Sequence, residues 1–298
     1  MNIETILFTY NRPDHTKKVL EGLRSEGFNK FKVYIDGAKN AKDLAERQVI
    51  LAMLQDIDWA AVSIVNREES FGLAKSIVTG VTEALTRSEA VIVLEDDCVP
   101  LPGFKVYMET TLAYYAGNSK VTSICGYRYP SLNIDQLESA VFTLERFCPW
   151  GWATWKESWD LFIPSLTDLV YKVQKTGKDI DRLGQDMKRY CSDPRFLNMQ
   201  MDIWSLNWIL SQYLYNSKII YPKNSLINNI GFDGSGVHSE VTTDFESEVS
   251  NMGLDRDFLI RSLSDNIEVD ENLQSEVVSF LESTSKMTMM IKKGVGSI

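Results

Sequence analysis

Apolar and polar positions along the first hundred residues follow two alternating periods. Short apolar runs rich in β-branched residues predict buried strands over residues 5–10, 31–36, 61–66 and 90–95. Between these runs, apolar residues recur at helical spacing, which predicts helices from Pro13 to about Gly27, over 41–56 and over 72–85. Strands that alternate with helices through short connections predict an α/β fold, in which a mostly parallel sheet carries helices on both faces.

Polar side chains follow each of these predicted strands. The carboxyl ends of parallel strands share one edge of a sheet, and ligands bind at that edge, so we expect one crevice there. A polar residue after any single strand is more often only the start of a loop, but four strand ends in succession favour a site. The residues concerned are Asn11, Arg12, Asp36, Asn66, Arg67 and the acidic residues 95–97.

The last of these strands ends in three consecutive carboxylates, Glu95, Asp96 and Asp97. Carboxylates this close raise each other's pKa, so a positive charge is expected among them. A divalent cation can serve, because carboxylates bind it and it in turn binds a diphosphate. The chain has only 2 histidines, which excludes a multi-histidine site and favours Mg²⁺ or Mn²⁺ on oxygen ligands. The first strand's turn, TYNRPDH, has no glycine, so neither a dinucleotide fingerprint nor a P-loop is present.

Tryptophans concentrate in the second part of the chain, where CPWGWATWKESWDLF holds four of them. Trp152, Trp155 and Trp159 have the spacing of one helical face, and core packing accounts for the last two. Gly151, between Trp150 and Trp152, would let the backbone approach a ligand, and an aromatic face suits the C–H side of a sugar ring. Sugar or acceptor binding by Trp150, Gly151 and Trp152 and simple core packing both stay open here.

Composition narrows the partners and the compartment. A net charge of -10 argues against nucleic acid, since phosphate binding needs a basic surface. No run of about 20 apolar residues and no signal-peptide pattern is present, so we expect a cytoplasmic protein. The 4 cysteines form no C-x-x-C pair and are expected to be reduced. Residues 254–283 are predicted to be helical, and the Met- and Lys-containing tail at 285–298 could contact a membrane surface or simply fray.

Several segments together resemble glycosyltransferases of the GT-A fold. They are TILFTYNRPDHTKKVLEGL, the strand ending at Asp36, and VLEDD. More narrowly, the chain resembles the N-acetylglucosaminyltransferase I group, which carries an E-D-D form of the D-x-D motif, a G-W-containing helix start, D-D-W and a G-V-S-H-like segment, in that order. The corresponding segments here are residues 95–97, 150–152, 202–204 and 236–239. This chain departs from the pattern at Ile203, where the group has a second aspartate, and in the reversed order of His238 and Ser239.

The resemblance implies a role for each candidate residue. It places Thr9, Asn11, Arg12, Asp36, Arg67 and Lys75 around the nucleotide or its diphosphate. It places Glu95 and Asp96 near the ribose or the donor sugar, and Asp97 on the metal. His238 would close over the diphosphate or join the metal shell, or it is a surface histidine. Asp202 matches the group's general base, which takes the acceptor hydroxyl's proton as that oxygen attacks C1; the alternative for Asp202 is a residue favoured by a helix dipole.

The resulting prediction is a metal-dependent, inverting glycosyltransferase that moves a sugar from a nucleotide-sugar, such as a UDP-sugar, to a hydroxyl of a saccharide or glycolipid acceptor. Residues 1–100 would form the nucleotide-sugar-binding half, 101–240 the acceptor and catalytic half of the same domain, and 241–298 a C-terminal helical extension. The enzyme would act in the cytoplasm, where it could lie peripherally at the inner face of the membrane. Two alternatives stay open: a sugar-phosphate nucleotidyltransferase, and a nucleotide-binding module without catalysis.

Overall fold

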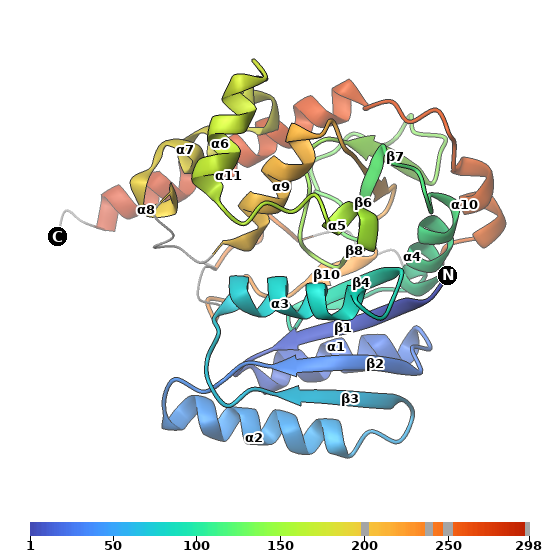
Figure 1. Ribbon diagram of the computed structural model, residues 1–298, viewed down its shortest axis with the longest axis vertical. Helices are drawn as coiled ribbons and strands as arrows, with labels where there is room; N and C mark the ends of the chain where they lie inside the picture. The colour runs from blue at the N-terminus through green and yellow to red at the C-terminus, as the bar shows by residue number, and fades with distance from the viewer. Residues whose placement is uncertain (198–202, 236–240, 247–252, 296–298) are drawn as a thin grey trace.

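The computed structural model describes residues 1–197, 203–235, 241–246 and 253–295, with side chains as far as residue 284 (Figure 1). The first half alternates strands and helices as the sequence predicts. Its elements are β1 (Ile3–Thr9), α1 (Pro13–Ser25), β2 (Lys30–Ile35), α2 (Ala41–Gln55), β3 (Ala61–Asn66), α3 (Leu73–Leu85), β4 (Ala90–Glu95), β5 (Cys98–Pro100) and α4 (Phe104–Tyr114).

The second half mixes short strands with helices. Its strands are β6 (Val121–Cys125), β7 (Val141–Leu144), β8 (Trp152–Trp155), β9 (Lys218–Pro222) and β10 (Ile227–Asn229). Its helices are α5 (Lys156–Trp159), α6 (Leu166–Lys175), the 3₁₀ turn η1 (Ile180–Leu183), α7 (Gln185–Ser192), α8 (Pro194–Leu197), α9 (Trp204–Leu214), α10 (Arg256–Ser262) and α11 (Glu271–Val295).

Local chemistry explains where the early helices begin. Pro13 occupies the first turn of α1, where its missing N–H costs no hydrogen bond. The side chain of Asn40 accepts a hydrogen bond from the backbone N–H of Asp43 and so caps α2. Gly72 precedes α3 with φ 74°, a left-handed conformation that only glycine adopts without strain. Each of these helices therefore starts within a few residues of a strand's carboxyl end.

The central sheet has eight strands in the order β3-β2-β1-β4-β8-β6-β9-β7. Strands β1 to β4 pair in parallel, whereas β8 runs antiparallel to both β4 and β6. The connection from β1 to β2 runs along the sheet in the opposite direction to that from β3 to β4, so right-handed crossovers place α1 and α3 on opposite faces. Figure 1 shows α3 in front of the sheet and α1 behind it. The predicted α/β fold, with a mostly parallel sheet and helices on both faces, is confirmed.

The direction of the strand order reverses beside β1, because β2 lies on one side of it and β4 on the other. Such switch points leave a crevice outside the carboxyl ends of the two strands. In this chain the two ends belong to Thr9 and Glu95, and Phe8 lies opposite Glu95 in the β1–β4 register. The fold therefore brings the turn after β1 against the acidic turn after β4.

The helical spacing predicted for the tryptophans is wrong in one respect. Trp152 and Trp155 lie on strand β8, and only the single turn of α5 that follows them is helical. The expectation that Trp155 and Trp159 belong to the core is confirmed, since both are almost fully buried. The indole N–H of Trp155 donates to the carbonyl of Leu112 on α4, whereas that of Trp159 donates to Thr82 on α3.

Helices α10 and α11 pack on the rest of the molecule. Leu259 of α10 and Val277 of α11 have no exposed surface, and the buried Gln274 accepts a hydrogen bond from the backbone of Glu145. Within the described residues, no helix combines the length and the apolar content that a membrane crossing requires. The membrane contact predicted for 285–298 involves side chains outside the described part of the chain.

Candidate active site

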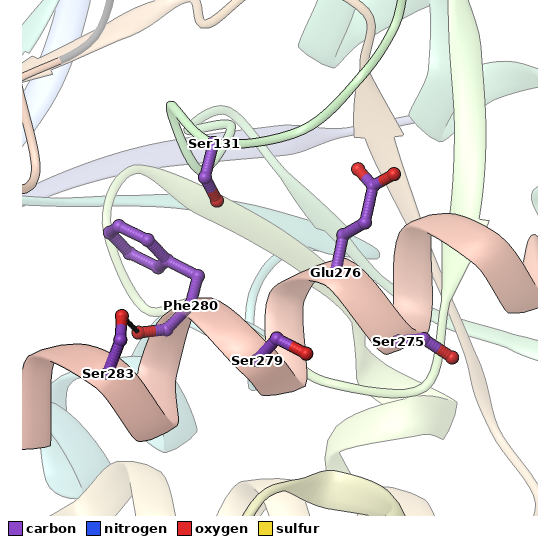
Figure 2. Close-up of a pocket in the computed structure, with 6 residues that line it drawn as sticks. All are labelled: Ser131, Ser275, Glu276, Ser279, Phe280 and Ser283. Atoms are coloured by element: carbon purple, nitrogen blue, oxygen red, sulfur yellow. Dashed lines mark hydrogen bonds between the residues drawn. The ribbon is translucent and has the colours of Figure 1, made fainter.

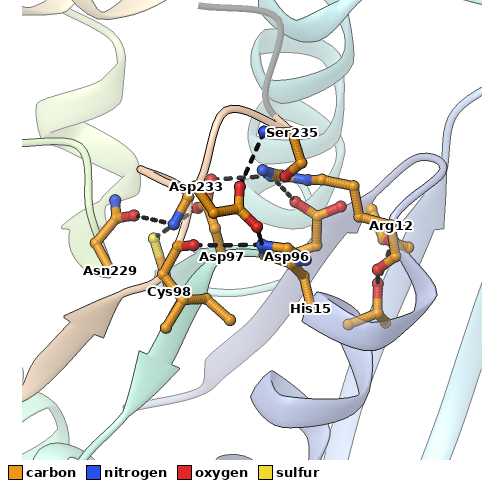
Figure 3. A network of polar contacts seen from close by, with 12 residues as sticks. Arg12, His15, Asp96, Asp97, Cys98, Asn229, Asp233 and Ser235 are labelled. Atoms are coloured by element: carbon orange, nitrogen blue, oxygen red, sulfur yellow. Dashed lines mark hydrogen bonds and ion pairs between the residues drawn. The ribbon is translucent and has the colours of Figure 1, made fainter. Parts of the chain in front are cut away.

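Arg12 lies between two carboxylates at the switch point of the sheet (Figure 3). Its guanidinium donates hydrogen bonds to Asp96 and, over 2.8 Å, to Asp97 Oδ2. This contact forms because Arg12 comes shortly after β1, the two aspartates come directly after β4, and β1 and β4 are parallel neighbours in the sheet. The Sγ of Cys98 lies 3.4 Å from the second Asp97 oxygen as a donor. The positive charge expected among the acids is therefore present within the chain itself.

Burial and charge act against each other in this cluster. Burial, with the charges of Asp97 and Asp96 adding to it, raises the pKa of Glu95 well above its ordinary value. Burial also raises the pKa of Asp96, although the charge of Arg12 opposes that shift. For Arg12, burial alone would lower the pKa, but the charges of Asp96 and Asp97 outweigh it and raise it. Protonation of Glu95 is therefore easier than that of an exposed glutamate, whereas Arg12 stays charged beside it.

A segment from far along the chain covers the same acids. The backbone N–H of Ile230 donates to the carbonyl of Asp97 over 2.9 Å. Gly231 lies so close that a Cβ there would be 2.4 Å from Asp97 Oδ2, so only glycine fits without displacing that carboxylate. The Nε2 of His15 lies 3.3 Å from the Ile230 carbonyl and 3.2 Å from a carboxylate oxygen of Asp233 (Figure 3). Both partners accept, so the Nε2 atom of His15 carries the proton.

His15 and Asp233 were not among the site residues predicted from the sequence. His15 lies three positions after Arg12 on α1, and residues three apart on a helix share a face, so helical spacing could have revealed it. Asp233 gave no such signal, because its approach depends on the antiparallel pairing of β10 with β5, which joins segments more than a hundred residues apart.

A second cluster forms at the carboxyl ends of β2 and β3. Asp36 accepts hydrogen bonds from the Ser70 hydroxyl and from the backbone N–H groups of Phe71 and Gly72. Its carboxylate therefore holds the turn that leads into α3. The guanidinium of Arg67 lies 4.4 Å from the Phe71 ring centroid and 3.8 Å from Asp36. Burial lowers the pKa of Arg67, although the charge of Asp36 opposes the shift.

Lys75 belongs to the same cluster. Its Nζ lies 4.0 Å from the centroid of the Phe71 ring, so two cations flank this aromatic side chain. Lys75 is exposed and Phe71 is partly exposed. The structure thus brings Asp36, Arg67 and Lys75 together around a phenylalanine that the sequence analysis did not single out.

Thr9 and Asn11 are both engaged within the protein. The hydroxyls of Thr9 and Thr16 lie 2.7 Å apart in a buried hydrogen bond. The amide of Asn11 donates to Asp43 over 2.8 Å, and the hydroxyl of Tyr10 donates to the same carboxylate. Burial, with Asp43 adding to it, raises the pKa of Tyr10 to about 12. These contacts fix the turn that presents Arg12.

The segment Trp150–Gly151–Trp152 divides between the surface and the core. Gly151 has φ 59°, and a Cβ on it would lie 2.5 Å from the side chain of Ile227. The missing side chain at Gly151 therefore leaves room for Ile227. Trp152 has no exposed surface and stacks on Trp204 with ring centroids 5.2 Å apart. Both residues are buried, which favours core packing, one of the two alternatives that the sequence left open for them. Trp150 is partly exposed and packs edge-on against Phe232 and Phe245.

The predicted base Asp202 and the predicted metal residue His238 lie outside the described residues. Helix α9 begins two residues after Asp202, at the buried Trp204. The described segment that precedes His238 stops at residue 235, two residues after Asp233.

The donor atoms near Asp97 fit a hard divalent cation. Within the described ranges, no group of three His, Cys, Asp or Glu side chains could hold a metal ion by itself. Mg²⁺ in phosphate-transferring sites is commonly bound by one or two carboxylates plus substrate phosphates, so a complete protein cage is not required. Asp97 is partly exposed, and its two oxygens keep lone pairs beyond those shared with Arg12 and Cys98. One partly exposed carboxylate just after the carboxyl end of β4 fits such a site.

No protein-family model matches the sequence, and no curated protein sequence matches it either. Among solved structures, the mannosyltransferase PcManGT from Pyrobaculum calidifontis in complex with GDP-Man and Mn²⁺ is similar at 15% identity and a TM-score of 0.37, over 59% of this chain and 46% of that one. A 4-diphosphocytidyl-2C-methyl-D-erythritol synthase from Anaerococcus prevotii is similar at 9% identity and a TM-score of 0.40, over 88% and 96%. The galactosyltransferase LgtC with donor and acceptor sugar analogues is similar at 10% identity and a TM-score of 0.35, over 59% and 66%. Likeness at this level does not determine the activity of the present chain.

Proposed function

We propose that this protein is a glycosyltransferase that takes a sugar from a nucleotide-sugar. The observation that carries the proposal is the meeting of Arg12, Asp96 and Asp97 at the switch point of a parallel sheet. A crevice of this kind is where α/β sheets bind nucleotides, and here it holds acids that could bind a metal, with Arg12 as their counter-charge within the chain. The narrower resemblance to the N-acetylglucosaminyltransferase I group stays a prediction within this proposal.

The donor would lie across the strand ends from β3 to β4. Phe71, flanked by Arg67 and Lys75, offers an aromatic face and positive charge for the nucleotide end. Asp36 would support the nucleotide site indirectly, because its hydrogen bonds hold the turn that carries Phe71. At the other end, Asp97 would hold Mg²⁺ or Mn²⁺, which supplies positive charge for the departing diphosphate. Glu95 would hydrogen-bond near the donor sugar, which is the role that the resemblance implies for it.

The acceptor would approach from the side of Trp150. This indole and the rings of Phe232 and Phe245 form a partly exposed aromatic surface that begins next to Gly231, the neighbour of Asp97. Aromatic faces of this kind suit the C–H side of a saccharide. Asp202 would act as the general base of an inverting transfer, taking the proton of the acceptor hydroxyl.

Donor hydrolysis tests the proposal without knowledge of the acceptor. UDP-glucose, UDP-N-acetylglucosamine and GDP-mannose are incubated with the protein and Mn²⁺, and released nucleoside diphosphate is measured. At least one donor should be hydrolysed slowly, and Asp97→Asn should reduce that rate about 100-fold. Asp14→Asn is the matched control, because Asp14 is an exposed carboxylate on the first turn of α1. A normal rate in Asp97→Asn would show that this carboxylate holds no metal.

The same assay separates the alternatives. A nucleotidyltransferase would release pyrophosphate from a nucleoside triphosphate and a sugar 1-phosphate, and would leave the nucleotide-sugars intact. Its triphosphate needs free cations after the first strand, whereas Arg12 is already paired with two carboxylates. A non-catalytic module would bind the nucleotide-sugar and release nothing. Asp202→Asn should abolish transfer to an acceptor and leave donor binding unchanged, so that normal transfer by this variant would refute the role of Asp202 as base.

A further inference from the structure

Helix α11 and the loop that contains Ser131 border an open surface hollow of about 430 Å³ (Figure 2). This hollow is separate from the carboxylate crevice, and its volume lies within the range of small-molecule binding sites. Its lining consists of Ser131, Ser275, Glu276, Ser279, Phe280 and Ser283. None of the residues assigned so far to the donor, the metal or the base is among them.

The lining combines hydroxyls, one carboxylate and one aromatic ring. Glu276 accepts a hydrogen bond from the backbone N–H of Asn133 through Oε2, over 2.8 Å, and this bond fixes the carboxylate and leaves Oε1 as an acceptor. The hydroxyls of Ser131 and Ser279 have no partner among the described residues, so both can donate to a ligand. Figure 2 shows Ser131 on the loop above the Phe280 ring and Ser279 on the helix below it.

These groups select a class of ligand. None of the six described lining residues is cationic, and Glu276 would repel an anion, so a phosphate or nucleotide is disfavoured. A hydrocarbon is disfavoured as well. It would displace the water that hydrogen-bonds to the hydroxyls and the carboxylate, and it would offer them no hydrogen bonds in return. A neutral molecule with many hydroxyls satisfies all of them, and the C–H face of a sugar ring also suits the partly exposed Phe280.

A continuous row of aromatic rings joins the hollow to the crevice. Phe280 packs against Phe245 with centroids 5.3 Å apart, and Phe245 packs in turn against Trp150 at 5.4 Å and Phe232 at 4.7 Å. Phe232 follows Gly231, which lies directly against Asp97. The hollow is therefore several ring contacts from the reacting end of the crevice, a separation that suits an oligosaccharide better than a single sugar.

We propose that this hollow binds a distal residue of a neutral oligosaccharide acceptor, whose reacting end lies near Asp97. The role as an acceptor subsite rests on the proposed glycosyltransferase function, but the binding itself does not. Glu276 and Ser279 hydrogen-bond the sugar hydroxyls, and Phe280 contacts the ring face. The enzyme would then distinguish an extended acceptor chain from a monosaccharide.

Saturation-transfer difference NMR tests the binding with no nucleotide and no metal present. The full chain is titrated with cellotetraose, maltotetraose, chitotetraose and mannotetraose, each at millimolar concentration. At least one should bind, and Glu276→Gln should weaken it about 5-fold, since a charged acceptor becomes a neutral one. Ser279→Leu should weaken it about 10-fold or more, because the larger side chain fills the hollow and removes a hydroxyl. Both positions lie at or near the surface of α11, so neither change removes a core side chain.

Glu282→Gln is the matched control, because this glutamate lies on the same helix, is also partly exposed and does not line the hollow. It should leave the binding unchanged. Failure of all four tetrasaccharides to bind would overturn the proposal, as would equal binding by the wild type, Glu276→Gln and Ser279→Leu. Because the assay contains no donor, a negative result here leaves the glycosyltransferase proposal standing, and loss of donor hydrolysis would leave this binding site standing.

Discussion

Arg12 meets the electrostatic requirement that three consecutive carboxylates at the end of a buried strand create. Burial and the neighbouring acids raise the pKa of Glu95, and the ion pairs set one guanidinium against Asp96 and Asp97. The ion pairs thus leave one negative charge in excess. A divalent cation would reverse that excess and leave the crevice positive toward a diphosphate. The sequence predicted a divalent metal as a counter-charge for these acids, and the structure supplies a further one, Arg12, from within the chain.

Replacing Gly151 by alanine tests whether the close packing of Ile227 requires a glycine at this position. Gly151→Ala must adopt φ 59° with a side chain and must also displace Ile227, so we expect a loss of about 3 kcal/mol or more in the free energy of unfolding. Gly117→Ala is the control, because Gly117 has φ 78° but nothing within 4 Å of a Cβ. It should lose only the conformational part, about 1–2 kcal/mol. Urea unfolding measures both, and equal losses would mean that Ile227 does not require this glycine.

At the scale of elements, the sequence pattern predicted those helices and strands whose formation depends on residues close together in the chain. The four parallel strands and the three helices between them came from apolar periodicity and helix-start signals, and all are present. Trp152 to Trp155 did not follow their helical spacing, because β8 fills the gap between β4 and β6 in the sheet. In a strand, residues three apart point to opposite faces, so Trp152 packs on Trp204 while Trp155 reaches α4. Only the pairing of β8 with β4 and β6, which the local sequence does not contain, decides that these tryptophans lie on a strand and not on a helix.

Glu145, just after β7, links η1 to β9 and should make the free energy of unfolding depend on pH. It accepts hydrogen bonds from Lys218 of β9 and from Arg182 of η1. Burial alone would raise the pKa of Glu145, but these two partners outweigh burial and lower it. A lowered pKa in the folded state means that the stabilisation is complete above the unfolded-state value, about 4.3, and is lost as the pH falls through the folded-state value.

We therefore expect Glu145→Gln to lower the free energy of unfolding by about 2 kcal/mol at pH 7, where the charged hydrogen bonds are present. The difference from the wild type should shrink steadily below about pH 4, because wild-type Glu145 becomes protonated there. Chemical unfolding at a series of pH values measures it. Glu138→Gln, an exposed glutamate shortly before β7, is the control and should change little at any pH. A Glu145→Gln deficit that did not vary with pH would mean that the ion pairs do not stabilise the fold.

At the scale of the whole molecule, the candidate site was predictable only as far as the parallel sheet determines it. Strand ends converge in any such sheet, so Arg12, Asp36, Arg67 and the acids could be grouped in advance. His15 and Asp233 could not be paired from the sequence, because β10 reaches β5 only after the chain has crossed the sheet. The aromatic row from Trp150 to Phe280 depends in the same way on α11 returning to the body of the protein.

This return packs α11, in the region predicted as a C-terminal helical extension, against the body of the protein. Val277 is fully buried, Gln274 accepts a hydrogen bond from the backbone of Glu145, and Glu276 accepts one from that of Asn133, so we expect α11 to unfold together with the rest of the molecule. Val277→Ala should therefore lower the midpoint of the main thermal transition, with a loss of about 2 kcal/mol, and far-UV and near-UV circular dichroism should report the same midpoint. Val241→Ala, at a position that is 79% exposed, should leave that midpoint almost unchanged. If Val277→Ala caused an early partial loss of helix and left the main transition in place, α11 would be an independent unit, and its hollow would not be held in register with the crevice.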